Sequence, residues 1–286
     1  MRRQAWQAGT MQRLFRQVDV FSSEPFLGNP VAVVLNGSGL STAQMQAFAR
    51  WMNLSETTFV EPPDNPGADY KVRIFTPSAE LPFAGHPTLG TCHAWLESGH
   101  VPVRDDWIVQ QCGAGLVTVR QGDGRLGFAA PPLLRAGPVE EPLMEQAAAQ
   151  LGIARSHVID AQWADNGPGW IAILLASAQA VLDVRCVTGD LDLGIAGPYP
   201  PGSECEFEVR AFFPVDGQPV EDPVTGSLNA SLAQWLLGSG RATAPYVVSQ
   251  GTAIGRRGRV RIDKDADGTI WVSGATSTQI AGQVDL

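Results

Sequence analysis

The chain has 286 residues, of which 44% are apolar and 17% are charged. These values predict one large or two medium globular domains and exclude an intrinsically disordered protein. Lys and Arg number 20 against 29 Asp and Glu, which gives a net charge of −9. This acidic balance argues against nucleic acid or an anionic membrane surface as a partner.

The four cysteines, Cys92, Cys112, Cys186 and Cys205, form no C-x-x-C pair and no zinc-ligand spacing with histidine. A disulfide scaffold is not expected at this size, and a reducing cytosol is the default. No apolar run reaches the roughly 18 residues that a membrane span needs. The first ten residues lack the apolar region of a signal peptide. We therefore expect a cytoplasmic protein without a membrane partner.

The first part of the chain alternates short strands with two helices. Residues 41–44 (Ser-Thr-Ala-Gln) form a capping-box signature that opens the first helix. Residues 76–87 are predicted to be irregular, and a second helix to run from Pro87 or Thr88 to about Glu97. Strands are predicted at residues 14–19, 31–35, 57–60, 70–75, 107–111, 115–120 and 125–129.

The second part follows Pro131-Pro132 and a loose segment to Glu140, which we interpret as a domain boundary. A helix is predicted around 143–151 and another over 226–237. Strands are predicted around 170–175 and 206–212, with further strands closing the chain.

An internal repeat is the most informative feature of the sequence. Residues 72–77 and 209–214 both read V-R-x-F-x-P. Each is followed by a Gly- and Pro-containing loop and then by a helix with a Trp-Leu pair. Similar Gln- and Gly-containing stretches follow in both parts. This ordered series predicts two similar halves, each of strands with a central helix.

The two repeated loops, 82–90 and 219–228, each place a proline near a first helical turn, where proline loses no helical hydrogen bond. His86 precedes one proline and Asp222 the other, and Asp222 is a candidate N-cap. If the halves face each other, two helix N-termini converge and can hold a small anion such as a carboxylate. The alternative is that both helices simply carry ordinary caps.

Catalytic candidates are few. No G-x-S-x-G, H-E-x-x-H or G-x-x-x-x-G-K-[ST] motif is present. Of the four histidines, only His86 lies in a repeated loop, and a lone histidine is commonly structural. The carboxylates near the loops are Glu80, Glu221, Asp222 and, between a helix and a strand, Glu56. Acid–base chemistry needs such a group in a water-poor cleft, but periodicity does not distinguish Glu56 from an exposed surface acid.

Five segments, in order along nearly the whole chain, resemble the phenazine-biosynthesis PhzF-type isomerase family. They are QVDVFSSEPFLGNPVAVV (17–34), NLSETTFV (53–60), RIFTPSAELPFAGHPTLG (73–90), EDPVTGS (221–227) and SQGTAIGRRGRVRI (249–262).

The resemblance implies an α+β fold like that of diaminopimelate epimerase, with two pseudo-symmetric halves and the active site between them. It implies an isomerase that moves a proton without cofactor or metal, on a substrate like trans-2,3-dihydro-3-hydroxyanthranilate. The family's acid–base glutamate matches Glu56. The substrate-holding residues match Gly85, His86, Gly226 and Ser227, and an aspartate at the site matches Asp222. A homodimer is also implied.

Diaminopimelate epimerase itself uses two opposed thiols ahead of two Gly-rich loops. Neither repeated loop here contains a cysteine, so a single-carboxylate proton shuttle fits better than a two-thiol racemase.

We therefore predict halves at residues 11–130, which the last strand (277–286) could join, and 131–276, with a cleft between them. A small anionic carboxylate would be held by His86, Ser227 and the backbone N–H groups of Gly85 and Gly226. Glu56 would move the proton, and Asp222 would orient the substrate. Two alternatives stay open. One is an epimerase or racemase with Asp222 as the second base, and the other is a carboxylate-binding protein without activity.

Overall fold

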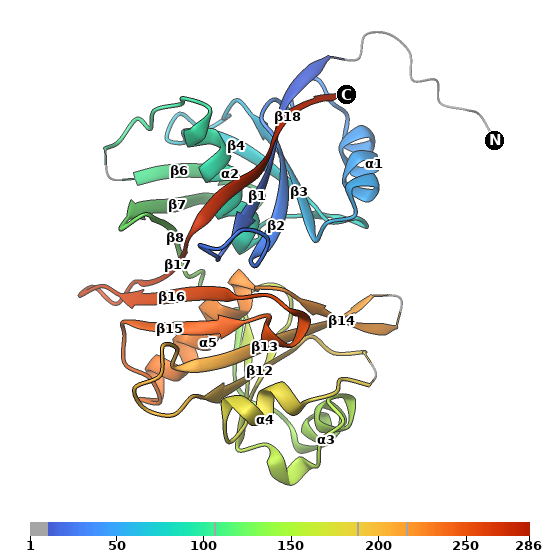
Figure 1. Ribbon diagram of the computed structural model, residues 1–286, viewed down its shortest axis with the longest axis vertical. Coiled ribbons are helices and arrows are strands. Elements are labelled where there is room, and N and C mark those ends of the chain that lie inside the picture. Colours follow the sequence, from blue (N-terminus) through green and yellow to red (C-terminus); the bar gives the residue numbers. More distant parts are fainter. Residues whose placement is uncertain (1–10, 106, 188, 216) are drawn as a thin grey trace, which may run out of the picture.

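A computed structural model describes residues 11–286 except 106, 188 and 216. Figure 1 shows two lobes, one above the other. We name them the first half (11–130, with 277–286 added) and the second half (131–276), which keeps the predicted division as a working proposal.

The first half alternates strands with two helices, and the last strand of the chain is added to it. Its elements are β1 (Gln12–Val20), β2 (Asn29–Val34), α1 (Thr42–Met52), β3 (Glu56–Glu61), β4 (Tyr70–Phe75), β5 (Glu80–Leu81), α2 (Gly85–Glu97), β6 (Trp107–Cys112), β7 (Gly115–Gly122), β8 (Arg125–Ala129) and β18 (Thr276–Asp285).

The second half has a similar alternation with three extra helical segments. Its elements are β9 (Arg135–Pro138), α3 (Glu141–Gln150), η1 (Arg155–His157), β10 (Asp160–Asp165), β11 (Ile171–Leu174), α4 (Ala178–Asp183), β12 (Leu193–Pro198), β13 (Phe207–Val215), β14 (Gln218–Asp222), α5 (Gly226–Gly238), β15 (Tyr246–Gln250), η2 (Thr252–Ile254), β16 (Gly258–Lys264) and β17 (Ile270–Gly274).

The repeated V-R-x-F-x-P segments form the equivalent strands β4 and β13. Each pairs antiparallel with the strand before it and the strand after it, and parallel with the strand beyond the next helix. The repeated arginines make equivalent ion pairs, because Arg73 lies 2.6 Å from Glu80 and Arg210 lies 2.7 Å from Glu221. The internal repeat predicted from the sequence is therefore confirmed.

Helices α2 and α5 lie at the centres of the two halves. Their sequences are apolar on nearly all faces, and most of their residues are buried, as expected of a helix surrounded by other elements. One continuous core contains both Leu89 of α2 and Leu228 of α5. The peripheral helix α1 differs from these two, because it buries one face only. Its N-terminus has the predicted capping box between Ser41 and Gln44.

One strand pairing and a crossover of the chain join the halves. Strand β17 of the second half pairs antiparallel with β8 of the first. Strand β18 then returns to the first half and pairs with β1 along its length, from Gln12 opposite Asp285 to Val20 opposite Thr276. Figure 1 shows β18 running up alongside β1 to end near the start of the described chain.

The structure differs from the sequence predictions where elements are short or pair at long range. Helix α2 begins at Gly85, two residues before the predicted start at Pro87. Strand β5 lies within the predicted irregular stretch, and β9 lies within the predicted boundary segment. Strands β10 and β12 and helix α4 were not predicted. Strands β5 and β9 exist because they pair with β4 and β10. The local sequence pattern does not reveal such pairings. In the described part of the chain, no helix is long and apolar enough to span a membrane.

Candidate functional site

Glu56 and His86 meet at the boundary between the halves. Glu56 is the first residue of β3, reached from α1 through Asn53, whose backbone is left-handed (φ 54°). His86 is the second residue of α2 and is 4% exposed. Its Nε2 lies 3.3 Å from Oε2 of Glu56. Both atoms are buried, and neither has a hydrogen bond to another described residue.

The contacts of His86 define its protonation state. Burial lowers the pKa of His86 to about 3, although a hydrogen bond to the backbone carbonyl of Pro30 acts in the opposite direction. The imidazole is therefore neutral at physiological pH. We assign the donor of the Pro30 hydrogen bond to Nδ1, because Nε2 faces Glu56. This assignment leaves the lone pair of Nε2 directed toward the Glu56 carboxyl.

Glu56 is protonated in the same pH range. Burial raises its pKa from 4.5 to about 8, and the nearby charge of Asp222 adds to this effect. A neutral Glu56 can donate its proton toward Nε2 of His86. An ionised Glu56 is a base that no lysine or arginine among the described residues pairs with. A carboxyl whose pKa lies near neutrality suits a group that must both remove and return a proton.

Asp222 ends β14 and faces the first half. Its Oδ1 accepts a hydrogen bond from Asn29 Nδ2 at 3.0 Å, and its Oδ2 accepts one from Thr225 Oγ1 at 2.6 Å. Burial raises the pKa of Asp222 to about 6, although these two hydrogen bonds lower it. The predicted N-cap role of Asp222 is wrong, because α5 begins at Gly226 and its N-cap is Thr225. The carboxylate instead bridges the two halves.

The N-termini of α2 and α5 meet in the centre of the molecule. A Cβ built on Gly85 would lie 2.8 Å from the Cα of Gly226, and one on Gly226 would lie 2.8 Å from the Cα of Gly85. Neither helix has a side-chain cap. The ordinary side-chain caps kept as the alternative are therefore absent. Backbone N–H groups of two first turns converge here, and such groups favour a bound anion.

Ser227 occupies in α5 the position that His86 occupies in α2. Its Oγ accepts a hydrogen bond from Trp170 Nε1 at 3.1 Å, and its backbone carbonyl accepts one from Asn166 Nδ2 at 2.8 Å. The structure thus brings Glu56, His86 and Asp222 into one cluster. It places Gly85, Gly226 and Ser227 at the adjoining helix starts.

Asn29 and Gln250 also belong to this cluster, although neither was predicted from the sequence as a site residue. Asn29 is fully buried, and its Nδ2 also donates to the carbonyl of Val224 at 2.9 Å and lies 3.3 Å from Nδ1 of His86. Gln250 donates to the backbone carbonyl of Asp222 and accepts from the backbone N–H of Thr225. Both residues lie in segments that resemble the PhzF-type family, and this resemblance is the sequence feature that could have identified them as site residues.

The second half also carries a carboxylate at the position of Glu56. Thr57 pairs with Phe75 in the first half, and Leu193 pairs with Phe212 in the second, so the preceding residues Glu56 and Asp192 correspond. Burial raises the pKa of Asp192 to about 6, with a further contribution from the charge of Asp165. The repeat therefore extends to an acidic residue that begins β3 in the first half and directly precedes β12 in the second.

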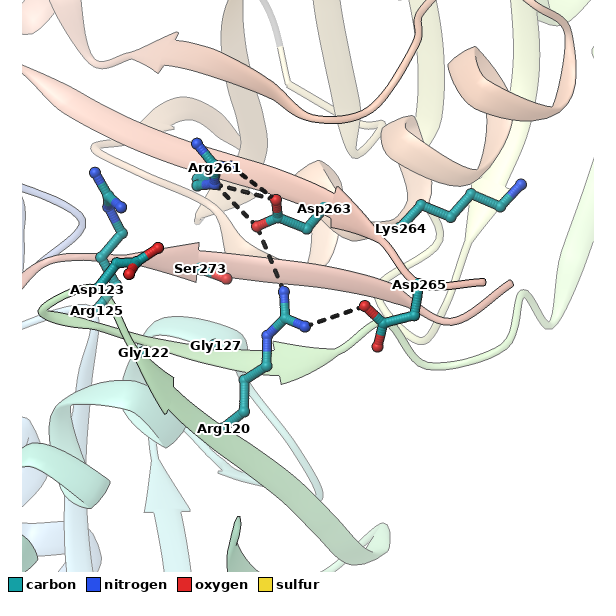
Figure 2. A pocket seen from close by; sticks show the side chains of 10 residues that line it. All are labelled: Arg120, Gly122, Asp123, Arg125, Gly127, Arg261, Asp263, Lys264, Asp265 and Ser273. Atoms are coloured by element: carbon teal, nitrogen blue, oxygen red, sulfur yellow. Dashed lines mark hydrogen bonds and ion pairs between the residues drawn. The ribbon is translucent and has the colours of Figure 1, made fainter. Parts of the chain in front are cut away.

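A separate polar cavity of about 390 Å³ lies where β7 and β8 meet β16 and β17 (Figure 2). Arg120 reaches Asp263 at 3.4 Å and Asp265 at 3.3 Å, and Arg261 also binds Asp263. Figure 2 shows these charged groups pairing with one another. None of the six predicted site residues lines this cavity, so it is a feature of the seam between the halves.

Comparisons with known proteins agree with this arrangement. A family model described as phenazine biosynthesis-like protein, PhzC-PhzF, matches residues 18–283. The trans-2,3-dihydro-3-hydroxyanthranilate isomerase of Pseudomonas fluorescens is 36% identical over 84% of this chain and 86% of its own.

Two solved structures show the fold. A PhzF-family protein of Bacillus anthracis superimposes with a TM-score of 0.81 at 19% identity, over 96% of this chain and 100% of its own. A hydroxyproline epimerase of Agrobacterium vitis superimposes with a TM-score of 0.59 at 13% identity, over 96% and 93%. The predicted α+β, epimerase-like fold is confirmed. With the family model and the relative in agreement, this chain belongs to the PhzF phenazine biosynthesis-like family and is an isomerase.

Proposed function

We propose that this isomerase moves a proton within a small carboxylate substrate similar to trans-2,3-dihydro-3-hydroxyanthranilate, with Glu56 as the acid and base. One observation carries the proposal: a buried carboxyl faces a neutral imidazole at 3.3 Å and has a pKa of about 8. The 36% identical relative from Pseudomonas fluorescens is a trans-2,3-dihydro-3-hydroxyanthranilate isomerase, which supports the substrate class.

The substrate carboxylate would lie at the two helix starts. Backbone N–H groups at Gly85 and Gly226, with the hydroxyl of Ser227, would hold it, because anions bind at helix N-termini. Asp222 would accept a hydrogen bond from an amino or hydroxyl group of the substrate. Its fixed hydrogen bonds from Asn29 and Thr225 keep the carboxylate in one orientation for this purpose.

Ionised Glu56 would then remove a proton from an activated carbon, the neutral acid would exchange that proton with solvent, and it would then deliver a proton to another carbon on the same face. His86 is neutral, so its Nε2 can accept a hydrogen bond from protonated Glu56 between the two transfers. Loss and return through one carboxyl keep protons and electrons balanced.

The alternative is an epimerase that removes a proton from one face of a carbon and returns one on the other. The fold relative with bound trans-4-hydroxy-L-proline shows that an epimerase of this fold takes an amino acid. Asp222 would supply the second base, and its charge already raises the pKa of Glu56, as expected of two nearby carboxyls.

Proton NMR in D₂O on a panel of small carboxylates, dihydro-hydroxyanthranilate included, tests the proposal. We expect wild type to introduce deuterium at a new carbon. Glu56→Gln should lower the rate by several orders of magnitude and still bind substrate. Glu61→Gln is the matched control at the other end of β3, where the side chain contacts Lys71 at the surface, and should retain full rate. Inverted configuration with an unchanged skeleton would support the epimerase instead, and normal turnover by Glu56→Gln would remove the role of Glu56.

A further inference from the structure

The loop between β1 and β2, residues 21–28, is held by the second half of the molecule. Nη1 of Arg256 donates to the carbonyls of Phe26 at 2.9 Å and Gly28 at 3.2 Å. The backbone N–H of Arg257 donates to the carbonyl between them, on Leu27, at 2.7 Å. Three consecutive carbonyls of the first half are thus bound by two consecutive residues of the second.

The loop adopts a conformation that needs such support. Phe26 has φ 67°, a left-handed backbone that a bulky residue rarely adopts, and its side chain is 68% exposed. Its own packing therefore does little to hold this conformation. Strained backbone of this kind persists where surrounding contacts enforce it. Around Phe26, the contacts on the second-half side are those from Arg256 and Arg257. The start of the loop is bound separately, because the N–H of Arg259 donates to the carbonyl of Phe21 at 2.7 Å.

The end of the loop is fixed from the first half as well. The N–H of Gly28 donates to Oδ2 of Asp19 at 3.1 Å, and a Cβ on Gly28 would lie 2.2 Å from the carbonyl oxygen of Val20. Gly28 is therefore held between Asp19 on one side and Arg256 on the other. Asn29 follows immediately, so the position of Gly28 defines where the Asn29 side chain begins.

Asn29 and Pro30 connect this loop to the acid–base cluster. Both hydrogens of the Asn29 amide are used, one for Asp222 Oδ1 and one for the carbonyl of Val224. The carbonyl of Pro30 accepts the hydrogen bond from the His86 ring. A displaced loop would alter the orientation of Asp222 and the tautomer of His86 together.

The segment that carries Arg256 also packs on the loop that precedes α5 (residues 219–228). A Cβ on Gly251 would lie 2.6 Å from the carbonyl oxygen of Pro223, and one on Gly258 would lie 2.4 Å from Val224 Cγ2. The N–H of Arg256 donates to the carbonyl of Gly251 at 2.9 Å, which ties its backbone to this segment. The backbone of Arg256 is thus fixed beside the loop at residues 219–228, and its side chain contacts the loop at residues 21–28.

We propose that Arg256 is a positioning residue, which orients His86 and Asp222 for proton transfer by holding the loop that precedes Asn29. No hydrogen bond or ion pair between described residues joins Arg256 directly to Glu56, His86 or Asp222, so it acts through the loop. This inference rests on the proposed function, and it assigns a role to the Gly-Arg-Arg-Gly stretch (255–258) of the sequence.

Arg256→Met tests the inference, because it removes the donor and keeps the aliphatic stem. Arg257→Met is the matched control. Its side chain pairs with Glu24, within the same loop, and with Glu204 at 3.7 Å. These ion pairs are exposed and contribute little, and the backbone N–H that binds Leu27 is retained, so the variant separates them from the carbonyl contacts of Arg256. Arg256→Lys should restore part of the effect, because one ammonium group can donate to two carbonyls. Three readouts are compared: the deuterium-incorporation rate, the ¹⁵N shifts of His86 and the ¹³C titration of Glu56 in ligand-free protein.

We expect Arg256→Met to lower kcat at least tenfold and to shift the His86 and Glu56 signals. Arg257→Met should stay within twofold of wild type with unchanged signals, and Arg256→Lys should fall between them. Wild-type signals and rate in folded Arg256→Met would overturn the inference, as would equal losses in both Met variants. The NMR signals need no turnover. If wild type exchanges no proton while Arg256→Met still shifts both signals, the positioning role stands and the proposed function fails.

Discussion

Gly85 and Gly226 touch through their backbones where the two central helices begin. A Cβ on either glycine would lie 2.8 Å from the Cα of the other. Because side chains are absent at both positions, the two N-termini approach closely enough to share one ligand. The contact therefore sets the distance between the halves at the candidate site.

Gly226→Ala should separate the helix starts. Its Cβ would meet backbone atoms of Gly85 and His86 at 2.8–3.2 Å, which cannot rotate away. We expect a loss of about 1–3 kcal/mol in the free energy of unfolding, the usual cost of overpacking, and a weaker affinity for carboxylates. Calorimetry and ligand titration measure both. Gly238→Ala in the same helix, where a Cβ meets no atom within 4 Å, should stabilise by about 0.5–1 kcal/mol. Equal effects of the two variants would contradict the role of the close contact.

The activity should depend on pH through Glu56. The base form is ionised Glu56, and the pKa in the ligand-free enzyme is about 8. Values of kcat/KM should therefore rise about tenfold per pH unit below this value and level off above it. A carboxylate substrate that stays ionised from pH 6 to 9 isolates the enzyme's own titration. A flat profile over this range would rule out Glu56 as the titrating base.

Glu56 should lower the stability of the protein at neutral and alkaline pH. Its folded-state pKa of about 8 exceeds the ordinary value of 4.5. Between these values the unfolded chain releases a proton that the folded protein retains, so stability falls as pH rises from about 4.5 to about 8. Glu56→Gln removes this dependence.

At pH 8 the variant should be more stable than wild type by a few kcal/mol, since each pKa unit corresponds to about 1.4 kcal/mol. At pH 4 the two should be equal. Urea unfolding at both pH values checks this, and an unchanged difference between pH 4 and pH 8 would argue against a raised pKa.

The repeated ion pairs offer a matched comparison of buried and exposed charges. The side chains of Arg210 and Glu221 are 7% and 10% exposed, whereas those of Arg73 and Glu80 are 20% and 38% exposed. Glu221→Gln should cost about 3–5 kcal/mol because it leaves a buried arginine unpaired. Glu80→Gln should cost at most about 1 kcal/mol. Denaturant midpoints measure both losses of stability. Similar losses in the two variants would show that burial does not determine how much each ion pair contributes.

The sequence predicted those features that local pattern or repetition encodes. The capping box at Ser41, the strand at residues 70–75 and the equivalence of the two halves are visible as spacing in the chain. The grouping of Glu56 with His86 came from family resemblance rather than from spacing. The two residues are 30 positions apart and on different elements, so only the fold brings them together. Their roles, the division into domains, the homodimer and the cytoplasmic location stay predictions.

Other features depend on contacts that no local pattern contains. Asn29 looks like a turn residue before proline, yet its amide bridges Asp222 and Val224 in the other half. Asp222 looks like an N-cap, yet the helix begins four residues later. In each case the contacts between the two halves determine the partners of the side chain. Local structural propensity contains no information about those contacts.

Strand β18 has a consequence for how the molecule is made. It supplies the partner of β1, yet it follows the whole of the second half in the chain. On the ribosome, β1 emerges with this edge unpaired, and an unpaired edge invites wrong partners. The second half has its strands nearly contiguous in sequence, so it can assemble before β18 is available. The first half, although synthesised first, is therefore expected to be completed last.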